Sequence, residues 1–296
     1  MTMPLDAKQP GSTPLDAPTF TQRKDFSFTP ENVARRIGVH ISSPDQLPTV
    51  DRSELEGKVA VITGSTRGIG AATAMVFAEY GMKVVINGRG VTPERGKMLV
   101  ENISAHGGDA VFIPADVSTS EGARFLMDVA MGAFGRIDVV VNNAGTIRDN
   151  LVMLMKQDEW YDVMRSNADS AFFVTQAAAR LMMKNKDPQG GMIIFDSSVG
   201  QEGFPGQINY AASKRAMEAI AEVTAQDPVY VRRGICTSIF RIGLTNTELT
   251  SSMTGEQKQA LLDVLPSHRE FSPEEIAKCM PFLATLKESG HILTLA

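Results

Sequence analysis

The chain has 296 residues and a formal net charge of −5, which arises from 29 basic and 34 acidic side chains. This length is enough for one large α/β core, and the mild acidity argues against nucleic acid or an anionic membrane as a partner. Cys236 and Cys279 are the two cysteines, and their spacing suits neither a metal site nor a disulfide framework. We therefore expect a reducing compartment, the cytoplasm by default. Neither a membrane helix of roughly 18 apolar residues nor a signal-peptide pattern is expected.

The N-terminal part differs in composition from the rest. Residues 1 to about 30 are polar and rich in proline, which predicts a disordered or loosely docked arm. Thr29-Pro30-Glu31 has the pattern of a helix start, and a short helix there would carry Val33 and Ile37 on one side. Residues 1–54 are interpreted as an N-terminal extension, either an ordinary tail or a functional lid. Residues 55–296 are interpreted as one compact domain.

A glycine-rich turn follows the first clear strand. Residues 59–62 are a short apolar run of the kind found in buried parallel strands. The run leads into TGSTRGIG (63–70) and then into a helix-like stretch. This order places backbone N–H groups and a helix N-terminus around a phosphate, which predicts dinucleotide binding. The candidate cofactor-binding residues of this turn are Gly64, Ser65, Arg67, Gly68, Ile69 and Gly70.

Strands and helices then alternate to the end of the chain. Further strands are predicted at 83–87, 110–114, 137–141, 191–196, 235–240 and 291–295. Helices are predicted over 156–165, 168–185 and 209–226. Two further helices are predicted to start at Thr92-Pro93 and at Pro273, and Ser272 and Glu275 have the spacing of a capping box at the second start. Such alternation indicates an α/β fold with a doubly wound parallel sheet.

The stretch SSVGQEGFPGQINYAASK (197–214) carries the candidate catalytic residues. Tyr210 and Lys214 are four residues apart, so they share one face of a helix. A phenol titrates near ~10 in water, and a nearby ammonium favours its ionised form. Ser197 follows a predicted strand, at the edge where α/β sheets bind ligands. Its hydroxyl would hold a carbonyl oxygen while Tyr210 supplies a proton.

Four motifs in order resemble the short-chain dehydrogenase/reductase family. They are the turn at 63–70, Asn142-Asn143-Ala144-Gly145, Ser197, and the segment from Tyr210 to Lys214. Within the family, RDNLVMLMKQDEW (148–160) and GQINYAASK (206–214) are most similar to the β-ketoacyl-carrier-protein reductase branch. The resemblance covers the chain from about Leu55. It implies a Rossmann-type fold and hydride transfer between a nicotinamide cofactor and a carbonyl or alcohol.

The resemblance also implies roles for individual residues. Tyr210 would be the general acid and base, and the Ser197 hydroxyl would position the substrate. Lys214 would bind the ribose and lower the pKa of Tyr210. Asn167 would anchor a water molecule that relays protons. Ser197 is preferred to Ser198 because its intervals to Gly200 and Tyr210 match the family pattern. Asp116 would meet the adenine. The remaining candidate cofactor contacts are Val117, Asn143, Ala144, Gly145, Gly243 and Thr247.

The chain departs from the family pattern near its C-terminus. Ile242-Gly243 stands where Pro-Gly is usual, and the chain ends where relatives continue into Asp-Gly-Gly. The resemblance implies a homo-oligomer that pairs through the helices around 156–165 and 168–185. Because the C-terminal tail is short, we expect the protein to form at least a dimer, and a tetramer is less expected than is usual for the family.

The turn after the second strand bears on cofactor choice. An acidic residue there would accept the ribose 2′-hydroxyl and repel a 2′-phosphate, but the strand ends in Asn87-Gly88-Arg89. Arg89 and Arg67 are suited to a phosphate, which predicts NADP(H). We expect an NADPH-dependent reductase of a ketone, such as a 3-oxoacyl thioester. The alternatives are a dehydrogenase of a polyketide, steroid-like or secondary-metabolite alcohol, and a non-catalytic nucleotide-binding scaffold.

Overall fold

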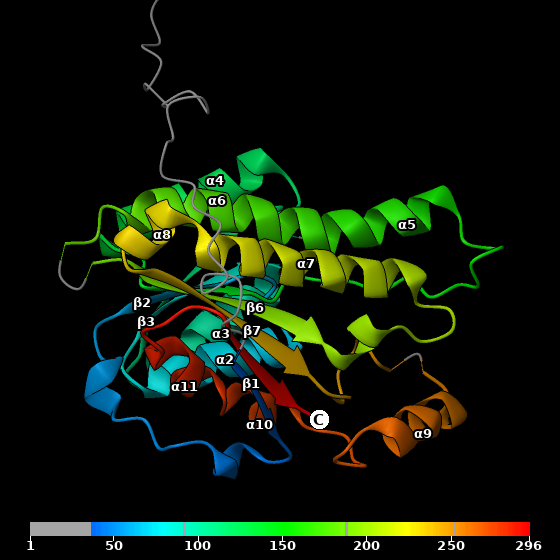
Figure 1. The fold of residues 1–296 in the computed structure, drawn as a ribbon. Coiled ribbons are helices and arrows are strands. Elements are labelled where there is room, and N and C mark those ends of the chain that lie inside the picture. Colours follow the sequence, from blue (N-terminus) through cyan, green and yellow to red (C-terminus); the bar gives the residue numbers. More distant parts are fainter. Residues whose placement is uncertain (1–36, 91–92, 187–188, 252) are drawn as a thin grey trace, which may run out of the picture. The chain divides into compact units, whose positions relative to one another are not determined.

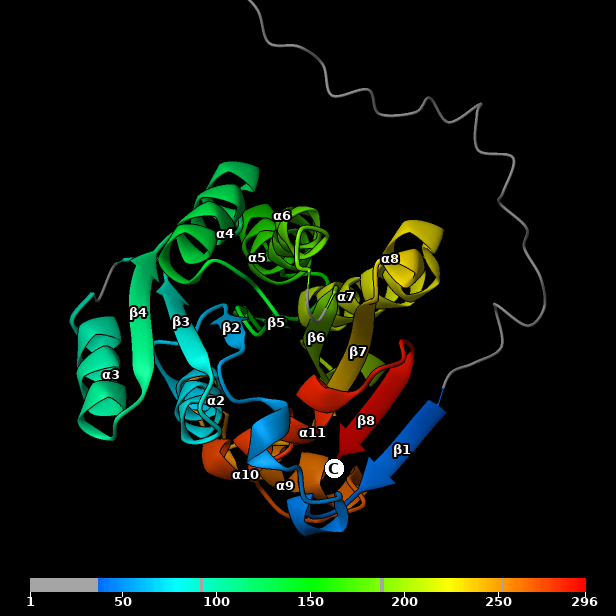
Figure 2. The same cartoon turned by 90° about the vertical axis from the view of Figure 1, so that its left-hand side faces the viewer.

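One parallel sheet of eight strands organises the described part of the chain, which is residues 37–296 without 91–92, 187–188 and 252 in this computed structural model. The strand order is β1-β8-β7-β6-β5-β2-β3-β4. The strands are β1 (Ile37–Ile41), β2 (Val59–Ile62), β3 (Lys83–Gly88), β4 (Asp109–Pro114), β5 (Val139–Asn142), β6 (Gly191–Ser198), β7 (Ile235–Ile242) and β8 (His291–Leu295). The predicted doubly wound Rossmann-type sheet is confirmed (Figures 1 and 2).

Helices cover both faces of this sheet (Figure 1). One face carries α4 (Ser120–Phe134), α5 (Gln157–Met164), α6 (Ser170–Met182), α7 (Ile208–Gln226) and α8 (Pro228–Arg232). The other carries α2 (Gly68–Glu79), α3 (Pro93–Ala105), α10 (Pro273–Ala277) and α11 (Met280–Thr285). An apolar core lies on each side of the sheet. Strands buried on both faces need apolar residues at every position, which explains continuous runs such as that of β2.

The sheet begins earlier in the sequence than expected. Ile37–Ile41 forms β1, which pairs in parallel with β8, from Ile37 opposite His291 to Ile41 opposite Leu295. This differs from the expectation that the compact domain starts near Leu55 and that Ile37 belongs to a helix. The neighbour of β1 lies at the far end of the chain, so no local pattern reveals the pairing. The proline-rich arm, the helix start at Thr29, Val33 and the cap at Thr92 lie outside the described residues.

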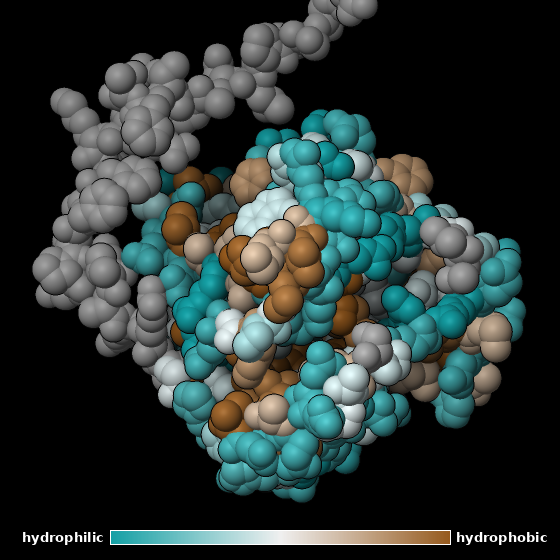
Figure 3. Space-filling model, turned by 90° about the vertical axis from the view of Figure 1, so that its right-hand side faces the viewer, coloured by the Kyte–Doolittle hydropathy of each residue, from teal (hydrophilic) through white to brown (hydrophobic). Residues whose placement is uncertain are grey.

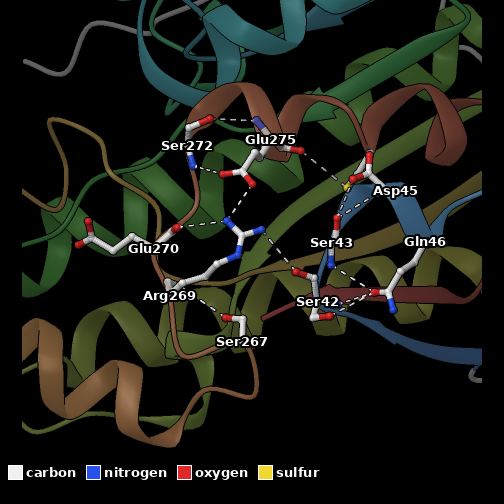
Figure 4. Close-up of polar contacts among 10 residues, drawn as sticks. Ser42, Ser43, Asp45, Gln46, Ser267, Arg269, Glu270, Ser272 and Glu275 are labelled. Atoms are coloured by element: carbon white, nitrogen blue, oxygen red, sulfur yellow. Dashed lines mark hydrogen bonds and ion pairs between the residues drawn. The ribbon is translucent and has the colours of Figure 1, made fainter.

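Arg269 ties the segment after β1 to the connection between β7 and β8 (Figure 4). Its guanidinium donates to Glu275 Oε1 at 2.8 Å, stacks on the Phe271 ring at 4.2 Å, and reaches the Ser42 carbonyl oxygen at 3.5 Å. Ser272 and Glu275 form the predicted capping box at the start of α10. The connection that Arg269 holds also carries α9 (Gly255–Val264), which closes part of the site described below.

Other helix boundaries differ locally from the prediction. The two helices expected over 156–185 run together through a π-helical turn, Arg165–Asp169. The short α8 and the isolated α9 were not predicted, since their apolar residues are too few to give a clear helical period. Within the described part of the chain, every helix is too short or too polar to cross a membrane.

Candidate active site

Two adjoining cavities lie at the carboxyl edge of the sheet, where the strand order reverses between β2 and β5. The first has a volume of about 430 Å³ and the second about 440 Å³. Ile69, Asn143, Gly145, Thr247 and Leu249 line both cavities, so the two are continuous. Figure 3 views the side of the molecule towards which the strands point, and hydrophobic side chains gather in the middle of it.

The glycine-rich turn at the second cavity leaves no room for a side chain at Gly64 or Gly70. Gly64 has a positive φ of 62°, and a Cβ atom there would lie 2.8 Å from the Ala144 Cα. At Gly70 a Cβ atom would lie 2.5 Å from the Asn143 Nδ2. That nitrogen donates to the carbonyl oxygens of Thr63 (2.7 Å) and Gly64 (3.1 Å). Asn143 therefore holds the turn in shape, and the turn leaves the start of α2 uncapped by any side chain.

The structure brings most of the predicted cofactor contacts together around the second cavity. Gly64, Arg67, Gly68, Ile69, Arg89, Asp116, Val117, Asn143, Ala144, Gly145 and Thr247 line it. Ser65 does not, because its hydroxyl is fully buried and donates to the Ile62 carbonyl oxygen at 2.7 Å. Gly70 does not line the second cavity either. Thr66, which the sequence analysis passed over, lines the cavity instead.

Three arginines, Arg67, Arg89 and Arg95, line the second cavity. Arg95 in the first turn of α3 was missed, because residue spacing gave no link between it and the glycine-rich turn. Glu248 pairs with Arg67 and, at 2.9 Å, with Arg95. These arginines lower the pKa of the Glu248 carboxyl, the hydrogen bond from Arg67 having the largest effect. Free helix N–H groups, a tight turn and several arginines form a donor set that fits the phosphates of a dinucleotide.

Asp116 keeps a local partner while lining the same cavity. Its Oδ1 accepts from the Ser118 hydroxyl at 2.7 Å and from the Ser118 backbone N–H at 3.1 Å. Thr119, not Asp116, caps α4. Asp116 therefore keeps this local partner and still lies in the wall of the second cavity.

Tyr210 lies in the first cavity next to Ser198, not Ser197. A hydrogen bond with the Ser198 side chain lowers the pKa of the Tyr210 phenol, although burial has the larger effect and raises it. A Cβ atom at Gly200 would lie 3.1 Å from the Tyr210 ring and 3.2 Å from Ser198 Oγ, so both groups pack on Gly200. Ser198 Oγ also accepts from the Gly200 N–H at 3.0 Å. The structure therefore places Ser198 in the position expected for the substrate-holding hydroxyl.

Ser197 faces the opposite side of β6. Its hydroxyl, 2 % exposed as a residue, donates to Glu218 Oε1 at 2.7 Å. Arg241 holds the same carboxylate with two hydrogen bonds of 2.9 and 2.7 Å. Ser197 still borders the first cavity, but its hydroxyl is engaged by Glu218, and Ser198 takes the place beside Tyr210 that the sequence analysis expected for Ser197. Counting thirteen residues back from Tyr210 ignored the length of the intervening loop, whereas side-chain alternation along β6 decides which serine faces the cavity.

Lys214 lies one helical turn after Tyr210 and is buried. Its Nζ donates to the Asp196 backbone carbonyl oxygen at 2.6 Å and lies 5.7 Å from the centre of the Tyr210 ring. Burial lowers the pKa of Lys214 to about 8, although Asp196 and Glu218 act in the opposite direction. The ammonium is directed at the Asp196 carbonyl oxygen, and the net shift of the Tyr210 pKa is upward because of burial. Tyr210 stays protonated at neutral pH and is available as an acid.

Asn167 occupies the π-helical turn between α5 and α6 and is fully buried. Its Nδ2 donates to Ser213 Oγ on α7 at 2.9 Å, and its Oδ1 accepts from the Thr146 N–H at 2.8 Å. Asn167 thus joins the loop after β5 to the helix that carries Tyr210 and Lys214. The four side chains that converge on the first cavity are Ser198, Tyr210, Lys214 and, from behind, Asn167.

The family follows from comparison with known proteins. The family model described as short chain dehydrogenase matches residues 58–258. The chain belongs to the short-chain dehydrogenase family. It is therefore an oxidoreductase, and the expected NADP(H) cofactor suits the arginine-lined cradle of this short-chain dehydrogenase.

Several relatives carry more specific names. The chain is 37 % identical over 239 residues to a 3-oxoacyl-[acyl-carrier-protein] reductase, FabG, of Haemophilus influenzae, covering 80 % of this chain and 94 % of that one. It is 35 % identical to a protein of the same description from Synechocystis, with 80 % and 93 % covered. Among solved structures, a dehydrogenase/reductase from Sinorhizobium meliloti matches with a TM-score of 0.75 and 29 % identity, covering 82 % of this chain and 96 % of that one.

Proposed function

We propose that this short-chain dehydrogenase is an NADPH-dependent ketoreductase that reduces 3-oxoacyl thioesters. The observation that carries the proposal is the pairing of Tyr210 with Ser198 on the wall of a cavity that continues into the dinucleotide cradle. The names of the relatives point to the same substrate class.

Each residue of the site has a separate role in the reduction. The glycine-rich turn and the arginines would hold NADPH, which when bound would supply the hydride for the carbonyl carbon. The Ser198 hydroxyl donates a hydrogen bond to the carbonyl oxygen and fixes its position. Tyr210 transfers its phenolic proton to that oxygen as the alcohol forms. Lys214, which is charged below about pH 8, then favours the phenolate that is left.

The lining of the first cavity suits an apolar acyl chain. Apolar side chains come from the loop after β5, from the loop before α7, from the connection after β7 and from α9. They include Ile147, Phe204, Pro205, Leu244, Leu249, Met253, Ala260 and Leu261. A ketone on an extended acyl chain would place its carbonyl at Tyr210 and its apolar part under α9.

The proposal includes the assembly and the setting of the enzyme. Exposed aromatic side chains on α5 and α6, Tyr161 and Phe172, support pairing of two copies through these helices. Both cysteines are free thiols, which supports a reducing setting such as the cytoplasm.

The decisive experiment follows NADPH absorbance with 3-oxoacyl thioesters of several chain lengths and with free cyclic and steroid-like ketones. We expect the thioesters to be reduced with the highest kcat/KM. The Tyr210→Phe variant should lose about 10²–10⁴ in kcat while it still binds NADPH. Preference for free ketones would shift the assignment to a secondary-metabolite or steroid-like substrate. Retained turnover by the Phe variant would overturn the catalytic assignment.

A further inference from the structure

Asp196 is a buried carboxyl group that the catalytic set does not explain. It lies in β6 two residues before Ser198, is 3 % exposed, and lines the first cavity with Tyr210 and Lys214. Neither of its carboxylate oxygens has a hydrogen-bond partner among the described residues. Buried polar groups without partners are rare because leaving them unpaired is unfavourable. An unpaired carboxyl in the wall of a cavity therefore indicates that a ligand supplies what it lacks.

Strand alternation decides which part of the site Asp196 serves. Ser197 faces Glu218 on α7, so Asp196 lies on the other side of β6, as Ser198 does. On that side the cavity wall continues to Ile69 at the start of α2 and to Ile242 at the end of β7. Ile69 also lines the cavity with the phosphate cradle. Asp196 thus lies in the wall of the cavity that continues through Ile69 into the phosphate cradle, where the reacting group of a dinucleotide with its phosphates in the cradle would enter.

The two forms of the cofactor differ in charge at that point. The nicotinamide ring of NADP⁺ is a cation, and the ring of NADPH is neutral. A carboxylate in a poorly hydrated wall stabilises a neighbouring cation far more than a neutral ring. We propose that Asp196 lets this protein distinguish the two forms, because its carboxylate stabilises the positively charged ring of NADP⁺. The inference rests on the proposed function, since it requires a nicotinamide cofactor in the first cavity.

The charges around Asp196 set the pH range of the effect. The ionisable side chains that line this cavity, among the described residues, are Asp149, Asp196, Tyr210 and Lys214. Burial raises the pKa of Asp196 to about 7, and Lys214 on α7 opposes this rise. Glu218, one turn further along α7, acts on Lys214. A cation bound beside Asp196 lowers its pKa further, so NADP⁺ binding near pH 7 should release a proton that NADPH binding does not.

Binding measurements without substrate test this directly. Dissociation constants of NADP⁺ and NADPH for the full chain are measured by titration calorimetry at pH 6 and pH 8. We expect the ratio Kd(NADPH)/Kd(NADP⁺) to rise about tenfold between these values, since the carboxylate forms over this range. The phosphates are common to both nucleotides, so their protonation cancels in the ratio. Repeating the titrations in buffers of different ionisation enthalpy should show proton release with NADP⁺ and none with NADPH.

Two variants isolate the residue. Asp196→Asn keeps the shape of the side chain without its charge and should abolish the rise in the ratio. Glu202→Gln removes an exposed carboxylate from the following turn, outside the cavity lining, and should leave the rise intact. The same rise in Asp196→Asn would overturn the inference. Should that variant not fold, equal proton release with both nucleotides in the unmodified protein would overturn it equally. Binding of neither nucleotide would overturn the proposed function, whereas binding of both with a flat ratio would overturn this inference alone.

Discussion

Ser197 and Ser198 are consecutive residues of β6 whose hydroxyl groups act on opposite sides of the strand. Ser197 donates to Glu218, which Arg241 also holds, and so joins β6 and β7 to α7. Ser198 is hydrogen-bonded to Tyr210 at the first cavity. The buried contact therefore fixes the helix that carries Tyr210 and Lys214, while the neighbouring residue lies beside Tyr210 in the first cavity.

Substitution of each serine separates these two roles. Ser198→Ala should lower kcat by about 10²-fold, because it removes a hydrogen bond to the reacting oxygen. Ser197→Ala should keep kcat within about threefold and lower the free energy of unfolding by about 1–3 kcal/mol, because it leaves Glu218 less well paired. Steady-state kinetics and urea unfolding measure both effects. A larger loss of kcat in Ser197→Ala than in Ser198→Ala would restore the assignment made from sequence spacing.

Cofactor preference should depend on the arginines of the second cavity. Arg89→Ala should lower kcat/KM for NADPH by about tenfold or more and leave that for NADH nearly unchanged, because a charge-assisted hydrogen bond to phosphate contributes about 1.5–3 kcal/mol. Arg95→Ala is the variant for comparison, because the Arg95 guanidinium already forms an ion pair with the Glu248 carboxylate. Kinetics with both cofactors measure the effect. Equal efficiency of the unmodified protein with NADPH and NADH would contradict this prediction.

The rate of ketone reduction should fall on the alkaline side of about pH 8. Lys214 has its pKa lowered to about 8, so it is charged below that value and neutral above it, whereas the pKa of Tyr210 is raised and the phenol stays protonated throughout. The profile of kcat/KM between pH 6 and pH 10 measures this loss. Lys214→Arg, whose guanidinium keeps its charge, should shift the loss beyond pH 10 even at a lower overall rate. A flat profile to pH 9.5 in the unmodified protein would show that the charge of Lys214 does not control the step.

Oligomer formation should depend on the exposed face of α5 and α6. Phe172 on α6 is 46 % exposed, and Phe172→Glu should convert the expected dimer to a monomer, because a charge there cannot be buried against a second copy. Met98→Glu on α3, where the side chain is 66 % exposed, is the matched control and should leave the dimer intact. Light scattering at micromolar concentration gives the mass. A monomeric unmodified protein would rule out the assembly.

The sequence by itself determined the alternation of strands and helices from β2 onward and the position of the glycine-rich turn. Apolar runs such as 59–62 have to be buried on both faces, so their alternation with helices was sufficient to predict a parallel sheet. The spacing of Tyr210 and Lys214 fixed their common helix face, and the glycines of 63–70 marked the cradle, since few other residues fit such a turn. These features depend only on neighbouring residues, so a short stretch of sequence is enough to predict them.

Only the tertiary structure decided features that depend on partners distant in the sequence. β1 pairs with β8 across almost the whole chain, and Arg95 meets the glycine-rich turn through Glu248. The choice between Ser197 and Ser198 depends on which face of β6 turns to α7, and the pKa values of Asp196 and Lys214 depend on their burial. Pairing, side-chain direction and burial arise from packing between elements. Residue spacing alone therefore does not predict them.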